Sequence, residues 1–317
     1  MATPLAPEYR LVREATLTKN ERHVARDISY ATTMRSRYGR WIVRSLENAT
    51  GRIGLIRRAR GYSAEVAAGR DIWQVMCDRY GLSLTLRAGT LGDIPATGPV
   101  VVVSNHPFGI LDGLLIGHIL SLRRGGDFRV MAHRVFINAP DLQHAVLPIA
   151  FDETKEAAKM NLETRAEAVR YLRAGGCVGI FPGGTVSTAQ RRGAPALDPV
   201  WRNFTAKMVA KSGATVVPIF FDGENSQIFQ IASRMHYMLR MGLLIREFRR
   251  RVDRPVSIAV GKPIGPDQLA RFGADSKAMM DFLRKATYDL SPTPVMADQL
   301  GYEFEAKYRK RDGSRGF

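Results

Sequence analysis

A histidine and a carboxylate stand close together after an apolar run in the first half of the chain. Residues 100–103 are four valines, His106 follows them, and Asp112 lies six residues further on. A helix turns by about 100° per residue, so on a straight helix these two side chains would lie about 240° apart. Pro107 and Gly109 forbid a straight helix and favour a bend. We predict a strand, a turn and then a helix from about residue 111, with the carboxylate folded back onto the imidazole.

This pair has the parts of a general base. A carboxylate that binds one ring nitrogen of a histidine fixes the tautomer and leaves the other nitrogen free to accept a proton. The alternative is structural: His106 would bind local backbone groups and Asp112 would cap the helix. The position at a strand end favours catalysis, as does a second loop of similar character downstream. Gly113 and Gly117 would give the helix a bare stripe for close packing on the sheet.

The second loop, FPGGTVS, spans residues 181–187 and again follows a strand. Gly183 and Gly184 would let backbone N–H groups approach a phosphate or carboxylate, and the hydroxyls of Thr185 and Ser187 would add donors. The alternative is a plain turn. Two arginines follow this loop, Arg191 and Arg192. They would either contact an anion or be solvated on the surface.

The surrounding sequence is typical of an α/β domain. We predict strands at about 84–88, 99–104, 128–133, 145–150, 177–181, 215–221 and 256–260, and helices at about 111–122, 161–174, 200–212, 227–250 and 275–289. This alternation favours a mostly parallel central sheet with helices on both faces and a site at the carboxyl ends of the strands. Asn161 is the expected N-cap of its helix. Pro218 indicates a strand near an edge, or one that passes the site.

A helical region is expected before the sheet. Apolar residues recur at helical spacing from Tyr38 to Arg60, and a second helix is expected from Ser63, its N-cap, to Tyr80. The first helix and the segment 231–251 mix apolar residues with arginine as interfacial helices do, unless both bury their apolar faces in the domain. We predict an N-terminal, membrane-associating helical region over 1–82, an α/β domain over 83–292 and a basic tail over 293–317.

The chain is strongly basic. It has 317 residues and a formal net charge of +17, which suits nucleic acid, an anionic membrane surface or an acidic protein, although an arginine-rich composition alone would also produce it. Two cysteines without metal-type spacing favour a reducing compartment and no metal site. There is no signal-peptide apolar core and no run of about 18 apolar residues. We expect a cytoplasmic protein, peripheral on the inner face of the cell membrane.

Together these motifs resemble those of the glycerolipid acyltransferases, the lysophosphatidate-type family. That family has Asn-His and then an acidic residue, Phe-Pro-Glu-Gly-Thr, and a Val-Val-Pro strand; this chain has NHPFGILDG, FPGGTVS and VVPIFFDGENS. The five residues between His106 and Asp112 are similar to the spacing in the haemolysin-like bacterial branch. Two departures argue against glycerol phosphate as acceptor. Gly183 replaces the glutamate of the third motif, and Glu153 falls where the second motif has a phosphate-binding arginine.

The resemblance implies an O-acyltransferase of membrane lipid synthesis. His106, held by Asp112, would deprotonate a lysolipid hydroxyl as that hydroxyl attacks the thioester of an acyl carrier protein or acyl-CoA, with no cofactor. Backbone N–H groups near 183–184 or at Asn105 would bind the oxyanion. The expected substrate-binding residues are Asn105, Phe108, Gly109, Pro182, Gly183, Gly184, Thr185, Ser187, Arg191 and Arg192.

Two other classes of protein share some of these features. A non-catalytic basic protein that binds a membrane or nucleic acid suits the charge, but no nucleic-acid-binding motif is present and no such partner is expected. A serine hydrolase needs Gly-x-Ser-x-Gly at a strand–helix turn. The nearest match, GYSAE at 61–65, lacks the second glycine and precedes the sheet.

Overall fold

The structure is a computed structural model, and it describes residues 29–34, 36–151, 154–296 and 298–305. A seven-stranded sheet forms its centre, in the order β1-β9-β8-β2-β5-β3-β4. The strands are β1 Ser83–Ala88, β2 Val100–Ser104, β3 Phe128–His133, β4 Val146–Ile149, β5 Cys177–Ile180, β8 Thr215–Phe221 and β9 Pro255–Val260. Each predicted strand is therefore present within two residues of its expected bounds.

Most of the sheet is parallel, as predicted. The neighbours from β8 through β2, β5 and β3 to β4 all pair in parallel, β9 pairs antiparallel with β8, and β1 pairs in parallel with β9. A separate antiparallel pair joins β6 (Thr188–Ala189) to β7 (Ala196–Leu197). Because β2 and β5 are parallel neighbours, the loops that follow them meet at one edge of the sheet.

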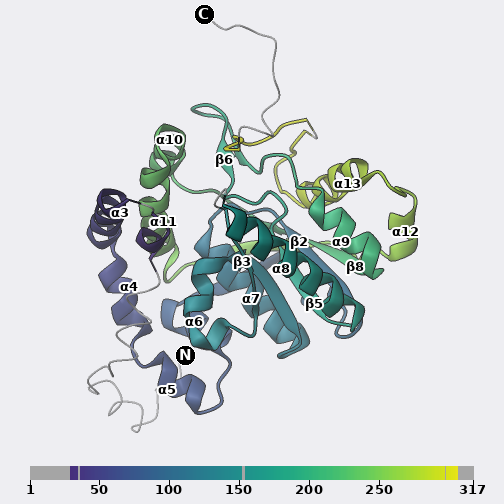
Figure 1. The fold of residues 1–317 in the computed structure, drawn as a ribbon, viewed down its shortest axis with the longest axis horizontal. Coiled ribbons are helices and arrows are strands. Elements are labelled where there is room, and N and C mark those ends of the chain that lie inside the picture. Colours follow the sequence, from purple (N-terminus) through teal and green to yellow (C-terminus); the bar gives the residue numbers. More distant parts are fainter. Residues whose placement is uncertain (1–28, 35, 152–153, 297, 306–317) are drawn as a thin grey trace, which may run out of the picture.

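Helices cover both faces of this sheet (Figure 1). The helices are α3 Arg37–Thr50, α4 Arg52–Ala59, α5 Tyr62–Ala67, α6 Ile72–Tyr80, α7 Ile110–Arg124, α8 Lys155–Arg173, α9 Phe204–Ser212, α10 Gln227–Met235, α11 Tyr237–Arg251, α12 Pro266–Ala270 and α13 Ser276–Tyr288. Val100 and Val102 pack in a core with residues of α6 and α7, whereas Val101 and Val103 pack with residues of α8, α9 and α13. Four consecutive valines suit β2 because both of its faces are buried.

Two predicted helices are each divided at a single residue. The helix expected over 38–60 is broken at Gly51, whose φ is 123° and where a Cβ atom would lie 2.2 Å from Cδ of Arg249. The helix expected over 227–250 is broken at His236, which has the extended φ of −158°. Both breaks let the flanking helices pack at different angles on the rest of the domain.

The predicted N-caps Ser63 and Asn161 are wrong. The segment 63–80 contains α5 and then α6, and Asp71 caps α6 by accepting a hydrogen bond from the Gln74 N–H at 2.9 Å. Helix α8 begins at Lys155, before Asn161, with Thr154 as its N-cap. The amide of Asn161 instead binds both backbone groups of Ala150, at 2.9 and 2.8 Å.

Two further differences concern the start of α9 and the place of β8 in the sheet. Helix α9 begins at Phe204 rather than near 200. The strand with Pro218 is not at an edge, since β8 lies between β9 and β2. Pro218 is tolerated there because pairing with β9 ends at Ile219 and resumes only as a single bridge between Val216 and Ile264.

The N-terminal helices share the main core with the sheet. Leu55 of α4 and Trp73 and Cys77 of α6 are buried in the same cluster as β2 and α7. The predicted domain boundaries stay predictions, and residues 1–28 and 306–317 of the outer two parts lie outside the described residues. Among the helices that are described, none is both long and apolar enough to cross a membrane.

Candidate active site

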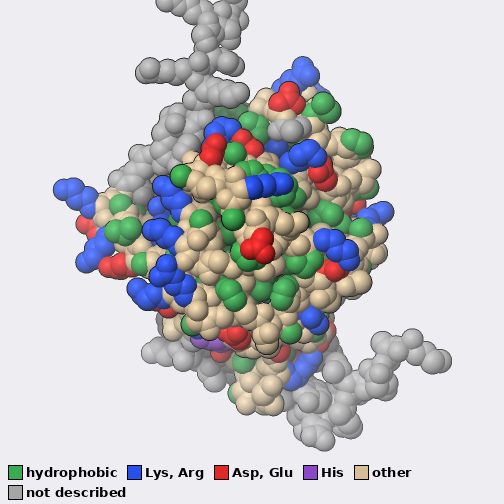
Figure 2. Space-filling view, turned by 90° about the vertical axis from the view of Figure 1, so that its right-hand side faces the viewer, with side chains coloured by type: hydrophobic (Ala, Val, Ile, Leu, Met, Phe, Trp, Pro, Cys, Tyr) green, Lys and Arg blue, Asp and Glu red, His purple; other side chains and the backbone are tan. Residues whose placement is uncertain are grey.

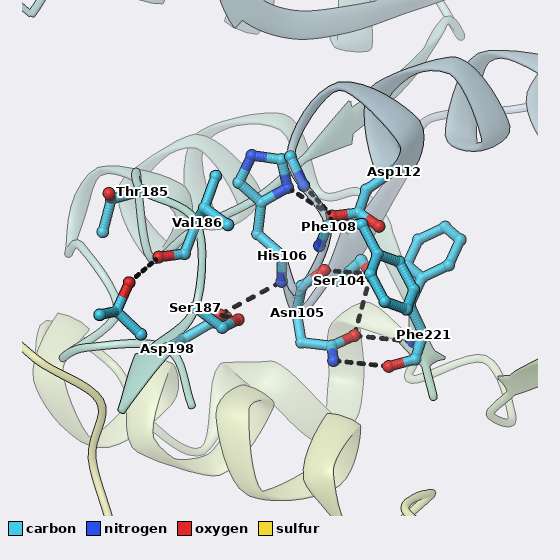
Figure 3. Close-up of polar contacts among 12 residues, drawn as sticks. Ser104, Asn105, His106, Phe108, Asp112, Thr185, Val186, Ser187, Asp198 and Phe221 are labelled. Carbon is cyan, nitrogen blue, oxygen red and sulfur yellow. Dashed lines mark hydrogen bonds and ion pairs between the residues drawn. The ribbon is translucent and has the colours of Figure 1, made fainter. Parts of the chain in front are cut away.

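The predicted bend between His106 and Asp112 is present. Strand β2 ends at Ser104, and α7 begins at Ile110 after Gly109, whose φ of 84° and ψ of −108° suit glycine alone. A Cβ atom at Gly109 would also lie 3.0 Å from Leu244 and 3.1 Å from Val186. The bend brings Nδ1 of His106 to 3.0 Å from Oδ2 of Asp112 (Figure 3).

Asp112 is fully buried and is held by the turn itself. Its Oδ2 accepts hydrogen bonds from the backbone N–H groups of Phe108 and Gly109, both at 2.8 Å. Nδ1 of His106 makes no well-formed hydrogen bond to the described residues, so its 3.0 Å approach to Oδ2 is a close contact that becomes an ion pair only when the ring is protonated. Such bonds commonly tighten only when substrate is bound.

The imidazole of His106 is oriented on a second side by an aromatic ring. It stacks on Phe181, which follows β5, with ring centroids 4.1 Å apart and planes inclined by 24°. The His106 side chain is 17% exposed. Its Nε2 makes no hydrogen bond to the described residues, so this nitrogen is the one that can accept a proton from a substrate.

The side chains of Asn105 and Phe108 are engaged within the protein, where they support the turn. The side-chain amide of Asn105 donates to the carbonyl of Phe221 at 2.9 Å and accepts from its N–H at 2.8 Å, which ties the end of β2 to β8. The Phe108 ring is buried under the guanidinium of Arg251, 4.2 Å from the ring centroid. Burial lowers the pKa of Arg251, and the charge of Asp112 opposes that shift.

The loop after β5 lies beside His106, but its hydroxyls are already engaged. Ser187 is buried, donates its hydroxyl to Asp198, and donates its N–H to the His106 carbonyl at 2.8 Å. Thr185 Oγ1 accepts from Arg240 at 2.7 Å. Gly183 and Gly184 were both predicted as oxyanion donors. The Gly184 N–H already donates to the Phe181 carbonyl, at 3.0 Å. Pro182 and Gly183 of the same loop are buried.

The arginine pair is not brought into the site. Arg191 and Arg192 are exposed in the turn between β6 and β7 and make no hydrogen bond or ion pair with the described residues around His106. Glu153 lies outside the described residues. Within the described part of the chain, no group of three or more His, Cys, Asp or Glu residues is arranged to hold a metal ion.

Two buried charged residues of this region were not predicted, Asp198 and Arg240. Arg240 of α11 is 3% exposed and donates to Thr185, to Thr188 Oγ1 at 2.7 Å and to the Val186 carbonyl at 2.8 Å. Burial lowers the pKa of Arg240 to about 9. Asp198 accepts hydrogen bonds from the backbone of His106 and from Ser187. In the sequence, Asp198 is a single carboxylate two residues before Val200 and Trp201. Only the arginines of this segment were predicted to bind substrate, so Asp198 was not identified.

Comparison with known proteins identifies the class. A family model described as acyltransferase matches residues 38–294, which is most of the chain. The protein therefore belongs to this acyltransferase family, and the resemblance to glycerolipid acyltransferases is confirmed at the level of the family.

Two curated relatives are both named lyso-glycine lipid O-acyltransferase. The protein from Phocaeicola vulgatus is 26% identical over 182 residues, which is 55% of this chain and 62% of the relative. The protein from Bacteroides thetaiotaomicron is 25% identical over 178 residues, 54% of this chain and 63% of the relative. The match thus spans somewhat less than two thirds of each relative.

A solved structure is also similar over most of its length. The crystal structure of the 1-acyl-sn-glycerophosphate acyltransferase from Thermotoga maritima aligns with 82% of this chain and 83% of its own, at 14% identity and a TM-score of 0.41.

Proposed function

We propose that the protein is an O-acyltransferase that moves a fatty acyl group from an acyl thioester to the hydroxyl of a lysolipid. The observation that carries this proposal is the His106–Asp112 pair at the carboxyl end of β2, 3.0 Å apart, in a chain of the acyltransferase family. The names of the two curated relatives support a lysolipid as the acceptor.

The proposed reaction needs one base and no covalent enzyme intermediate. Nε2 of His106 takes the proton of the acceptor hydroxyl while the hydroxyl oxygen attacks the thioester carbon and forms the new C–O bond. Asp112 stabilises the imidazolium that results. When the tetrahedral intermediate collapses, the C–S bond breaks and the leaving sulfur takes the proton back from Nε2, which yields an ester and a free thiol.

The oxyanion of that intermediate needs preorganised donors. With the Gly184 amide engaged in a turn, the remaining loop donors are the backbone N–H groups of Gly183 and Thr185, which make no hydrogen bond to the described residues. We assign the oxyanion site to this loop. The donor is an acyl carrier protein or acyl-CoA, and the acidic character of either suits a chain with a net charge of +17.

We further propose that the protein works at a membrane surface, docked through the layer formed by α3, α10 and α11. Figure 1 places these helices together on one side of the sheet. Large apolar side chains of this layer stand out into solvent: Tyr38, Trp41, Ile228, Ile231, Met235 and Tyr237. A groove of about 270 Å³ beside Trp41 is lined by Ala31, Thr32, Arg40, Trp41, Arg44 and Ser45. Apolar side chains that alternate with arginine are typical of interfacial helices.

Figure 2 presents the surface on the side of α9, α12 and α13, which differs in its side chains from the layer of α3, α10 and α11. Basic, acidic and apolar side chains are interspersed there. Helix α11 itself is mostly buried, including Met241, Leu244 and Phe248, so its apolar face belongs to the domain core. The side chains proposed to contact the membrane therefore come mainly from α3 and α10, and from Tyr237 at the start of α11. We propose the inner face of the cell membrane as the location.

The proposal is tested by identifying a product. The purified protein is incubated with labelled acyl carrier protein or labelled acyl-CoA and a panel of lysolipids that includes lyso-glycine lipid, lyso-ornithine lipid and lysophosphatidate. We expect an ester product from an acceptor with an amino-acid headgroup, detected by mass spectrometry. Absence of any acylated lipid with both donors would favour the alternative of a non-catalytic basic membrane protein.

A further inference from the structure

Asp198 places a second buried carboxylate beside His106, and the proposed proton transfer does not use it. Asp198 directly follows β7 and is fully buried. Its Oδ1 accepts hydrogen bonds from the backbone N–H of His106, at 3.2 Å, and from the Ser187 hydroxyl, and its Oδ2 accepts from Nε1 of Trp201 at 2.9 Å. Figure 3 shows His106 between Asp112 on its ring side and Asp198 on its backbone side.

These contacts form a closed ring that fixes the His106 backbone. The His106 N–H is bound by Asp198, and the His106 carbonyl accepts from the Ser187 N–H at 2.8 Å. Ser187 in turn donates its hydroxyl to the same carboxylate. Because the imidazole has only two side-chain torsions, the direction of Nε2 follows from the orientation of this backbone.

The position of Asp198 also accounts for the glycine in the third motif. A Cβ atom at Gly183 would lie 3.2 Å from Cβ and 3.3 Å from Cγ of Asp198, so the aspartate occupies the space beside this glycine. The related motif has a glutamate at that place. In this chain the carboxylate next to the loop comes from residue 198 instead of residue 183.

Three donors converge on the Asp198 carboxylate: the His106 N–H, the Ser187 hydroxyl and Nε1 of Trp201. Burial is the largest influence on this group and raises its pKa, while hydrogen bonds from Ser187 and Trp201 and the charges of His106 and Arg284 partly offset that shift. The three hydrogen bonds fix the orientation of the carboxylate, and with it the position of the acceptor that holds the His106 backbone.

We propose that Asp198 is a positioning residue for His106: its carboxylate holds the backbone N–H of the base directly and the backbone carbonyl through Ser187. The inference deepens the proposed function and rests on it. Asp198 touches neither the acyl donor nor the acceptor in this scheme and acts only through His106 and Ser187.

The test is the Asp198→Asn variant, which keeps the size of the side chain and removes its charge. We expect kcat to fall roughly 10- to 100-fold with KM little changed, because the hydrogen bonds that hold the His106 backbone become weaker. In the resting protein, the backbone amide of His106 should exchange its hydrogen with solvent faster than in the wild type, as measured by NMR. The matched control is Trp201→Phe, which removes a donor from the carboxylate but leaves its contact with His106 and should leave the exchange rate unchanged.

The outcomes separate this inference from the proposed function. An unchanged exchange rate of the His106 amide in Asp198→Asn overturns the inference, whether or not a substrate is known. Faster exchange in a protein that acylates no lysolipid supports the effect of Asp198 on His106 and contradicts the proposed function. If Asp198→Asn does not fold, Ser187→Ala tests the same ring: a roughly tenfold lower kcat at unchanged KM supports it, and an unchanged kcat overturns it.

Discussion

At the scale of single residues, the orientation of His106 depends on three separate segments. Asp112 comes from the first turn of α7, Phe181 follows β5 and Asp198 follows β7. None of these groups is held by a flexible surface side chain, since Asp112 and Asp198 are fully buried. A base whose direction is fixed in this way loses little freedom when the substrate binds.

The first prediction concerns Asp112→Asn. The asparagine can still accept from the Phe108 and Gly109 amides, but it removes the negative charge beside Nδ1. We expect kcat to fall by roughly 10²- to 10⁴-fold, the range for loss of an oriented general base, while the protein stays folded. Saturation kinetics measure this. Asp267→Asn on the exposed face of α12 is the control, and an Asp112→Asn rate equal to that of the control would rule out the role of Asp112.

The second prediction concerns Gly183→Ala. The new methyl group would contact Asp198 at 3.2 Å, which is tighter than normal packing, so the carboxylate must shift by a few tenths of an ångström. We expect a lower kcat in a folded protein, because that shift is transmitted to the His106 backbone. Kinetics with the identified substrate measure the change, and a fully active Gly183→Ala enzyme would show that the position of Asp198 is not critical.

At the scale of elements, α7 is positioned by a close contact that differs from the predicted one. Gly113 and Gly117 were expected to form a bare stripe against the sheet. A Cβ atom at Gly117 would instead lie 2.2 Å from the ring of Trp73 in α6, whereas a Cβ atom at Gly113 would meet no other residue within 4 Å. Only Gly117 therefore makes a close contact, and it joins α7 to α6. This contact positions α7, which bears Asp112 in its first turn.

The third prediction follows from this difference. Gly117→Ala should lower the free energy of unfolding by about 1–3 kcal/mol, because the added methyl group overpacks the contact with Trp73. Gly113→Ala in the same helix is the matched control and should be neutral or stabilising by up to about 1 kcal/mol, since alanine favours a helix. Urea denaturation measures both, and equal stabilities of the two variants would contradict the packing described for α7.

The elements that the sequence predicted are those whose signal is local. Strands buried on both faces, such as β2, show as continuous apolar runs, and the bend before α7 shows as Pro107 and Gly109. The division at Gly51 was missed, because the helical spacing of apolar residues continues across this glycine and the close approach of Arg249 exists only in the folded chain. Asp198 was missed for the same reason, since nothing near it in the sequence shows that it binds the backbone of His106.

At the scale of the whole molecule, the exposed apolar groups of α3 and α10 lie near the site. Val43 of α3 and Phe229 of α10 share a core cluster with Val186 of the loop after β5 and with Ile110 at the start of α7. A membrane against this layer would therefore be close to the base. This arrangement suits an acceptor that is a single-chain lipid within a bilayer.

The fourth prediction concerns Trp41→Ser. Trp41 is 66% exposed, and the change should weaken binding to vesicles that contain anionic lipid, because it removes apolar area and interfacial anchoring. Leu162 of α8 is equally exposed at 67%, so Leu162→Ser is the matched control and should bind as the wild type does. Vesicle flotation at low and high salt measures this. Equal binding by both variants would place the membrane contact elsewhere.

The fifth prediction concerns His106→Ala, which removes the proposed base of the acyl transfer. The measurement is the initial rate of ester formation from a labelled acyl thioester to the identified lysolipid, with circular dichroism to confirm that the fold is intact. We expect a rate roughly 10²-fold or more below the wild type in a folded protein. A folded His106→Ala variant that forms the same ester at the wild-type rate would show that His106 is not the base.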